Sequence, residues 1–181
     1  MQTHGPWTIH ESQRIYQDAW IDVQLDQVTR PDGKPGTYTT VQLKPGVCVI
    51  ALDDRGAVHL TREFHYAVGR FTLEGVSGGI ESGEAVELAA ERELAEELGL
   101  TARCWTRLGQ VDPFTAAICS TVDLFLAQDL SPCPTDMEGT EQIEHISMPL
   151  AEAIAMVREG QISHAPTCVA LLMIALDSQT Q

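Results

Sequence analysis

Three glutamates at fixed spacing are the residues of this sequence best suited to chemistry. Glu93, Glu96 and Glu97 lie three and four residues apart, and a helix that advances about 100° per residue places all three within an arc of roughly 100°. Like charges this close repel one another, which costs stability unless a cation lies between them. Because carboxylate oxygens suit Mg²⁺ and Mn²⁺, the spacing indicates a divalent metal site. An acidic helix that merely faces solvent is the general alternative.

The helix that carries these acids is predicted from Glu84 to Leu98. An apolar stripe opposite the carboxylates should dock it on the core and leave the acids pointing outward. The stripe consists of Leu88, Leu94, Ala95 and Leu98. Gly99 is expected in the left-handed conformation that ends many helices. The glycines expected in a preceding loop, where the backbone could approach a phosphate or metal closely, are Gly78, Gly79 and Gly83.

The spacing extends upstream of the helix. Five residues separate Gly78 from Glu84, and seven more precede Arg92, which opens the run to Leu100. This pattern resembles the Nudix box, with every fixed position filled. The resemblance implies a metal-dependent hydrolase of diphosphate linkages in which Arg92 orients the metal-binding glutamates. Considered by itself, Arg92 could also pair with Glu96 one helical turn on, and the two roles are compatible.

The resemblance also implies which residues bind Mg²⁺ or Mn²⁺. Glu93 and Glu97 match the principal ligands, Glu96 matches a further one, and the backbone carbonyl of Ser77 matches a site that often completes the shell of the first metal. The implied metal-site residues are therefore Ser77, Glu93, Glu96, Glu97 and Glu141. Glu141, together with Glu138, matches loop glutamates that approach the metals and help to activate water.

Beyond the box, most of the chain resembles the ADP-ribose pyrophosphatase branch of the Nudix hydrolases. The less specific matching features are residues 62–69, residues 73–78, Pro113 and residues 160–165. The branch implies an α+β fold with a mixed β-sheet core between helices and an N-terminal antiparallel β lobe. It implies hydrolysis of a nucleoside diphosphate sugar, with ADP-ribose as the first candidate, to a nucleoside monophosphate and a sugar phosphate. Members are commonly homodimers that exchange N-terminal lobes.

The residues implied for substrate binding are Arg62, His65, Arg70, Glu74, Pro113 and Phe114. A surface ion pair is an equal alternative for any one of these arginines. His65 stands where many relatives have an arginine, and Phe114 stands where they have a glycine. Because a mostly neutral imidazole cannot clamp a phosphate as a guanidinium does, GDP-mannose and ADP-glucose remain open beside ADP-ribose. An ordinary strand histidine with a hydrogen-bonded ring is the alternative for His65.

Two rival functions come from other classes. A non-enzymatic nucleotide sensor with the same fold would not need intact metal carboxylates, yet Glu93 and Glu97 are both present. A calcium-binding module would need an alternating Asp/Asn loop that ends in glutamate, and the sequence has none. The enzyme is therefore the favoured interpretation.

The amino-acid composition limits the kinds of partner that the protein can bind. The chain of 181 residues has a formal net charge of −15 and two lysines, Lys34 and Lys44, so it lacks the basic surface that nucleic acids require. Its five cysteines are scattered and form no close pair with metal-ligand spacing, which suits reduced thiols in a cytosol. The longest apolar stretch, 168–176, is too short to cross a bilayer. We expect a soluble cytoplasmic protein without a membrane partner.

Hydrophobic alternation and turn residues predict two domains, a β lobe over 1–44 that serves dimerisation and a hydrolase domain over 45–181. Strands are predicted at 20–25, 38–43, 47–52, 58–64, 71–76, 105–111, 121–127 and 143–148. A polar loop is predicted at 131–141, where prolines and glycine break regular structure. Two further helices are predicted at 149–158 and 166–176, each with proline in its first turn.

Overall fold

The computed structural model describes residues 1–135 and 142–178, and contacts divide the chain into two compact units. The first unit comprises Met1–Pro45 with Phe114–Thr121, and the second comprises Gly46–Pro113 with Val122–Gln181. The strands of the first unit are β1 (Gln2–His4), β2 (Trp7–Gln17), β3 (Ile21–Thr29), β4 (Pro35–Leu43) and β10 (Ile118–Cys119). The strands of the second unit are β5 (Gly46–Leu52), β6 (Ala57–His65), β7 (Arg70–Glu74), β8 (Val76–Gly79), β9 (Leu100–Val111), β11 (Val122–Pro132) and β12 (Glu144–Pro149). Its helices are α1 (Val86–Leu98), α2 (Leu150–Arg158) and α3 (Ala165–Ser178).

The first unit is a five-stranded sheet in the order β1-β2-β3-β4-β10. Strands β1 to β4 pair antiparallel along the chain, whereas β10 adds to β4 in parallel. The amide of Val41 also donates to the carbonyl of Ala117 at 2.8 Å. The segment 114–121 joins the lobe through these backbone bonds, and a strand of two residues is too short to show in a hydrophobic pattern.

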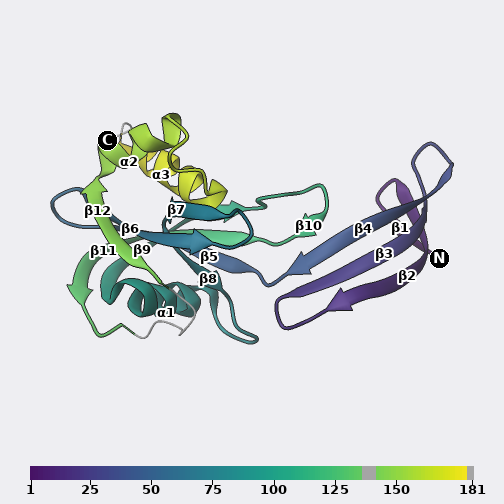
Figure 1. Cartoon of the computed structure of the whole chain (residues 1–181), viewed down its shortest axis with the longest axis horizontal. Helices are drawn as coiled ribbons and strands as arrows, with labels where there is room; N and C mark the ends of the chain where they lie inside the picture. The colour runs from purple at the N-terminus through teal and green to yellow at the C-terminus, as the bar shows by residue number, and fades with distance from the viewer. Residues whose placement is uncertain (136–141, 179–181) are drawn as a thin grey trace. The chain divides into compact units, whose positions relative to one another are not determined.

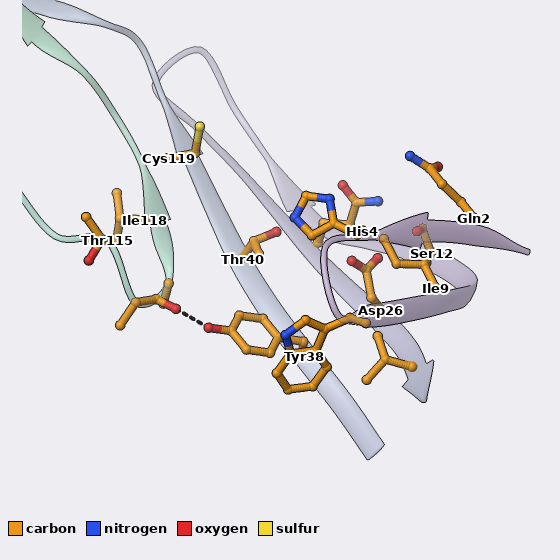
Figure 2. A pocket seen from close by; sticks show the side chains of 15 residues that line it. Gln2, His4, Ile9, Ser12, Asp26, Tyr38, Thr40, Thr115, Ile118 and Cys119 are labelled. Atoms are coloured by element: carbon orange, nitrogen blue, oxygen red, sulfur yellow. Dashed lines mark hydrogen bonds between the residues drawn. The ribbon is translucent and has the colours of Figure 1, made fainter. Parts of the chain in front are cut away.

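A cavity of about 490 Å³ lies within this unit (Figure 2). Trp7 and Tyr38 line it as an edge-to-face pair with ring centroids 5.3 Å apart. Asp26 also lines it, and its Oδ1 is buried without a hydrogen-bond partner among the described residues. The lining includes none of the residues predicted for chemistry.

The second unit contains a seven-stranded mixed sheet between helices (Figure 1). The strand order is β12-β6-β5-β11-β9, with β7 paired to β6 and β8 paired to β5. The β5–β11 pair is parallel and the other pairs are antiparallel. The predicted α+β class with a mixed sheet core between helices is therefore confirmed.

Strand β5 explains why two layers of helices are needed. Val47, Val49 and Ala51 pack with α1 in one core cluster. Cys48 and Ile50 pack with residues of α2 and α3 in the other. Because successive strand residues face opposite sides of a sheet, the continuous apolar run from Val47 is buried on both faces.

Several element boundaries differ from the prediction. Helix α1 begins at Val86 rather than at Glu84, and Gly78 and Gly79 belong to β8 rather than to a loop. Ser131 and Pro132 continue β11 because they pair with Thr101 and Leu100 of β9. Cross-strand pairing thus extends strands into segments whose own residues favour a loop. No helix in the described ranges is long and apolar enough to cross a membrane.

Candidate active site

Helix α1 ends as predicted, and Leu94 and Leu98 of the predicted docking stripe are buried, but the rest of the buried face differs. Gly99 has φ 61° and ψ 39°, and its amide bonds the carbonyl of Ala95. The predicted place of Leu88 on the docking stripe is wrong, because its side chain is 57% exposed. The buried apolar residues of the helix are Ala89, Ala90, Leu94 and Leu98.

The predicted outward direction of the acids is also wrong for two of them. Glu93 and Glu97 are each only 9% exposed, and as an i, i+4 pair they share one buried edge of α1. Gly78 of β8 makes room for the first of these side chains, since a Cβ at Gly78 would lie 1.9 Å from Glu93 Oε1. The glycine therefore lets a carboxylate enter the space beside the strand.

Arg92 joins the carboxylates of this region. Its guanidinium donates to Glu93 Oε1 at 2.8 Å and to Glu96 Oε2 at 2.9 Å, which confirms the predicted pairing with Glu96. It also donates to the carbonyl of Gly79 at 2.9 Å and to both carboxylate oxygens of Glu84 at 2.9 and 3.1 Å. The bonds to Glu84, then those to Glu93 and Glu96, raise the pKa of Arg92 above its usual value despite partial burial. Arg92 thus remains a cation that holds neighbouring acids in place.

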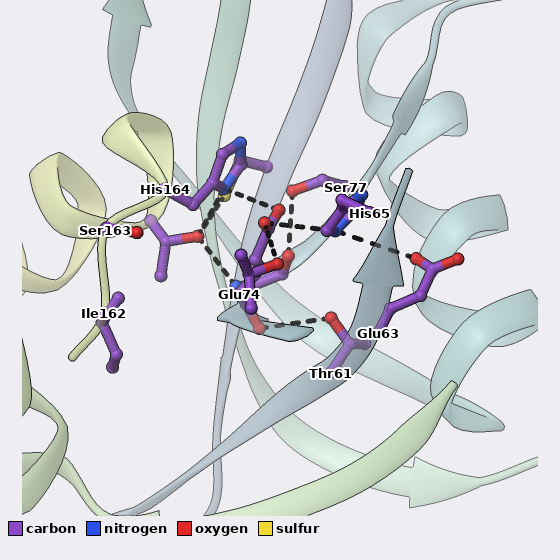
Figure 3. A network of polar contacts seen from close by, with 12 residues as sticks. Thr61, Glu63, His65, Glu74, Ser77, Ile162, Ser163 and His164 are labelled. Atoms are coloured by element: carbon purple, nitrogen blue, oxygen red, sulfur yellow. Dashed lines mark hydrogen bonds and ion pairs between the residues drawn. The ribbon is translucent and has the colours of Figure 1, made fainter. Parts of the chain in front are cut away.

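Two of the predicted substrate residues meet in a second cluster, drawn in Figure 3. Glu74, at the end of β7, is 12% exposed and accepts a hydrogen bond from Thr72 Oγ1 at 2.6 Å. Its Oε1 lies 3.2 Å from His65 Nε2, and its Oε2 lies 3.1 Å from His164 Nδ1. Burial lowers the pKa of His164, and the nearby His65 lowers it further, while Glu74 opposes both effects. His164 belongs to the segment 160–165 that matches the ADP-ribose pyrophosphatase branch, but that match had given it no role.

The other predicted residues do not converge in the same way. Arg62 pairs with Glu144 at 2.9 Å and lies over the ring of Phe71 at 4.2 Å, so an ion pair accounts for its charge. Arg70 donates to Ser163 Oγ at 3.0 Å. Pro113 ends a segment of the second unit, whereas Phe114 belongs to the first unit and is 55% exposed. Glu138 and Glu141 lie outside the described residues.

Two family models match consecutive segments of this chain. The family model of the NUDIX domain matches residues 42–167, which include α1 and β8. The chain belongs to the Nudix family. The model of the nucleoside diphosphate sugar hydrolase N-terminal domain matches residues 7–41 of this Nudix hydrolase.

Several known proteins are similar to this chain over most of its length. An ADP-ribose pyrophosphatase of Bacillus subtilis is 28% identical over 93% of this chain and 92% of its own. An ADP-ribose pyrophosphatase of Mycobacterium tuberculosis is 28% identical over 96% of this chain and 85% of its own. A crystal structure of an ADP compounds hydrolase superposes with a TM-score of 0.84 at 22% identity, covering 99% of this chain and 98% of that one. At that identity the structural likeness shows the shared fold.

The Nudix box of this chain offers donors suited to a divalent cation. No group of three or more His, Cys, Asp or Glu side chains within 1–135 and 142–178 is already arranged to hold a metal ion. The donor chemistry nevertheless fits, because Glu93 and Glu97 are buried carboxylates and hard oxygens suit Mg²⁺ and Mn²⁺. The space at Gly78 that admits the Glu93 carboxylate is a second sign of a built site. The metal ligands, Ser77 included, remain predictions.

Glu84 is a member of the Nudix box whose task only the structure reveals. It lies before α1 and accepts two bonds from Arg92, and its carboxylate also accepts the amide of Glu81 at 2.9 Å. The Arg92 bond, followed by the Glu81 amide, holds the pKa of Glu84 below its usual value. Glu84 therefore positions Arg92, which in turn holds Glu93 and Glu96.

Glu84→Gln should lower stability in a pH-dependent way. A carboxyl whose pKa is depressed by folding stabilises the native state above its usual pKa of 4.5, and this contribution is lost as the pH falls through the folded-state value. We expect a loss of about 1 kcal/mol near pH 7, because the pair is partly solvated. Urea unfolding of both proteins at several pH values measures it. A difference that grew on acidification would contradict this role.

Proposed function

We propose that this Nudix hydrolase cleaves the diphosphate linkage of a nucleoside diphosphate sugar, with ADP-ribose as the first candidate, in a reaction that requires Mg²⁺ or Mn²⁺. The products would be a nucleoside monophosphate and a sugar phosphate. The observation that carries the proposal is the gathering of Glu93 and Glu96 by Arg92, beside Glu97 on the same helix. The names of the two bacterial relatives support ADP-ribose as the substrate.

The residues of the box would divide the work between binding and orientation. Glu93, Glu96, Glu97 and the carbonyl of Ser77 would hold the cations. Bound cations would supply charge neutralisation of the diphosphate and a lower pKa for the attacking water. Arg92 would keep two of the carboxylates oriented, and Glu84 would keep Arg92 in place. Glu141 or Glu138 would accept the proton of the water that attacks phosphorus.

The negative charge of the chain explains why an anionic substrate would need bound cations. A protein with a formal charge of −15 repels a diphosphate over most of its surface. Arg62 already has Glu144 as its partner, and Arg70 bonds Ser163. Local cations bound by the box would offset this repulsion where the reaction occurs.

A substrate panel tests the proposal. We expect the highest kcat/KM for ADP-ribose among ADP-ribose, GDP-mannose, ADP-glucose and a nucleoside triphosphate, each assayed with Mg²⁺ and with product identification. His65→Arg should preserve or raise kcat/KM for ADP-ribose, because a guanidinium beside Glu74 can also clamp a phosphate or ribose oxygens. A decrease for ADP-ribose together with good hydrolysis of another sugar nucleotide would favour that sugar. A clear preference for the triphosphate would refute the substrate class.

We also propose a homodimer formed through the N-terminal unit. Ile15, Tyr16 and Trp20 are each more than half exposed, and Val28 is the buried apolar residue among those described in this unit. A sheet with so little core gains stability when a second copy covers it. We expect light scattering at micromolar concentration to give twice the chain mass of 19.8 kDa. A monomer mass would contradict the proposal.

A further inference from the structure

The first turn of α3 contains a polar side chain that is fully buried. Thr167, in the first turn of α3, is 0% exposed, and its Oγ1 accepts the amide of Gly75 at 2.8 Å. The same oxygen lies 2.8 Å from His164 Nδ1. His164, directly before α3, also lies 3.1 Å through its Nδ1 from Glu74 Oε2 (Figure 3). Residues 164–167 therefore contact both Glu74 and Gly75, which form the corner where β7 ends.

Gly75 packs too closely against its neighbours to carry a side chain. A Cβ at Gly75 would lie 2.8 Å from Ile50 Cδ1 and 2.8 Å from the carbonyl oxygen of Val49, so the backbone fits closely against β5. The carbonyl of Gly75 accepts Ser77 Oγ at 2.8 Å. The amide and the carbonyl of Gly75 are thus both hydrogen-bonded to side chains. Because a buried backbone group must find a hydrogen-bond partner, these two bonds hold Gly75 in one conformation where the strand ladder is interrupted.

The corner leads directly into the residues that face the box. Ser77 and Gly78 pair with Cys48 and Val47 of β5, and the Glu93 carboxylate occupies the space that a side chain at Gly78 would fill. Because only three residues separate Gly75 from Gly78, a shift at Gly75 would displace the carbonyl of Ser77 and the backbone against which the Glu93 carboxylate lies.

We propose that Thr167 and His164 are positioning residues of the active site, which hold the Gly75 amide and the Glu74 carboxylate so that Ser77 and Gly78 keep their place beside Glu93. This inference rests on the proposed function, because it takes Glu93 and Ser77 as metal ligands. It assigns a task to His164, within the segment 160–165, and to Thr167 at the start of α3.

Thr167→Val tests the inference, since it keeps the shape of the side chain and removes the oxygen that accepts the Gly75 amide. The dissociation constant for Mn²⁺ is measured by titration calorimetry, and kcat and KM are measured with ADP-ribose. We expect Mn²⁺ binding to weaken about tenfold, as for one lost buried hydrogen bond, with kcat reduced more than KM is raised. Thr167→Ser restores the hydroxyl and should recover Mn²⁺ affinity to within about threefold of the wild type.

Two more variants separate positioning from general stability. Leu171→Val alters packing in the core cluster around α3 without changing a polar contact of the corner, so it should lower the melting temperature and leave Mn²⁺ binding unchanged. His164→Ala removes a side chain that is 26% exposed and should leave the protein folded. We expect it to weaken Mn²⁺ binding about threefold, since it leaves Glu74 without one partner.

The outcomes distinguish this inference from the proposed function. Wild-type Mn²⁺ affinity and turnover in folded Thr167→Val or His164→Ala would overturn the positioning role alone. An equal loss of Mn²⁺ binding in Leu171→Val would also overturn it, because any disturbance of α3 would then suffice. A wild-type protein that bound no Mn²⁺ and cleaved no sugar nucleotide would overturn the proposed function and the inference together.

Discussion

Glu93→Gln and Glu97→Gln should each reduce kcat by about two orders of magnitude or more, because each removes a proposed ligand on which transition-state stabilisation depends. Both side chains are buried, Glu93 against Gly78 of β8, and an amide of the same size keeps the packing at each position. The change in kcat should therefore arise without loss of the fold. Steady-state hydrolysis of ADP-ribose with Mg²⁺, and circular dichroism on the same samples, measure the two properties.

Glu91→Gln is the matched control for these variants. Glu91 belongs to the same helix but is exposed, so its replacement should leave kcat unchanged. Addition of a chelator to the wild type should abolish turnover, and Mg²⁺ should restore it. Turnover near that of the wild type in both Glu93→Gln and Glu97→Gln would remove the basis for the metal site.

Gly78→Ala should lower kcat by about 100-fold, because a displacement of about 1 Å in a catalytic group can cost that much. The backbone at Gly78 lies outside the left-handed region, so alanine is allowed there by its own conformation. Its Cβ would however lie 1.9 Å from Glu93 Oε1 and 2.0 Å from Glu93 Cδ. The Glu93 carboxylate must therefore move away from β8, and this movement disturbs its hydrogen bond with Arg92.

A double variant shows whether this effect passes through Glu93. In a Glu93→Gln background the ligand is already lost, so adding Gly78→Ala should reduce kcat little further. Kinetics of the two single variants and the double variant give the coupling between the positions. Losses that multiplied in the double variant would show that Gly78 acts on another part of the site.

Much of the fold follows from patterns that are local in the chain. The apolar run of β5 predicts a strand buried on both faces, and two core clusters share its residues in alternation. The strands predicted at 47–52 and 58–64 form the β5–β6 hairpin, in which residues 53–56 make the turn. Strand ends were less predictable, because the β9–β11 pairing carries Ser131 and Pro132 into a ladder that their own propensities oppose.

By itself, the sequence determined the Nudix box, the shared helix of Glu93, Glu96 and Glu97, and the pairing of Arg92 with Glu96, since helical geometry relates residues three and four apart. Only the tertiary structure decided which way the acids face. Glu93 is buried where β8 passes α1 with a glycine at the point of contact, and Glu97, one helical turn further on, is buried as well. Likewise, the Thr167–Gly75 hydrogen bond joins residues 92 positions apart. Such contacts depend on how the sheet brings distant segments together, which no local spacing encodes.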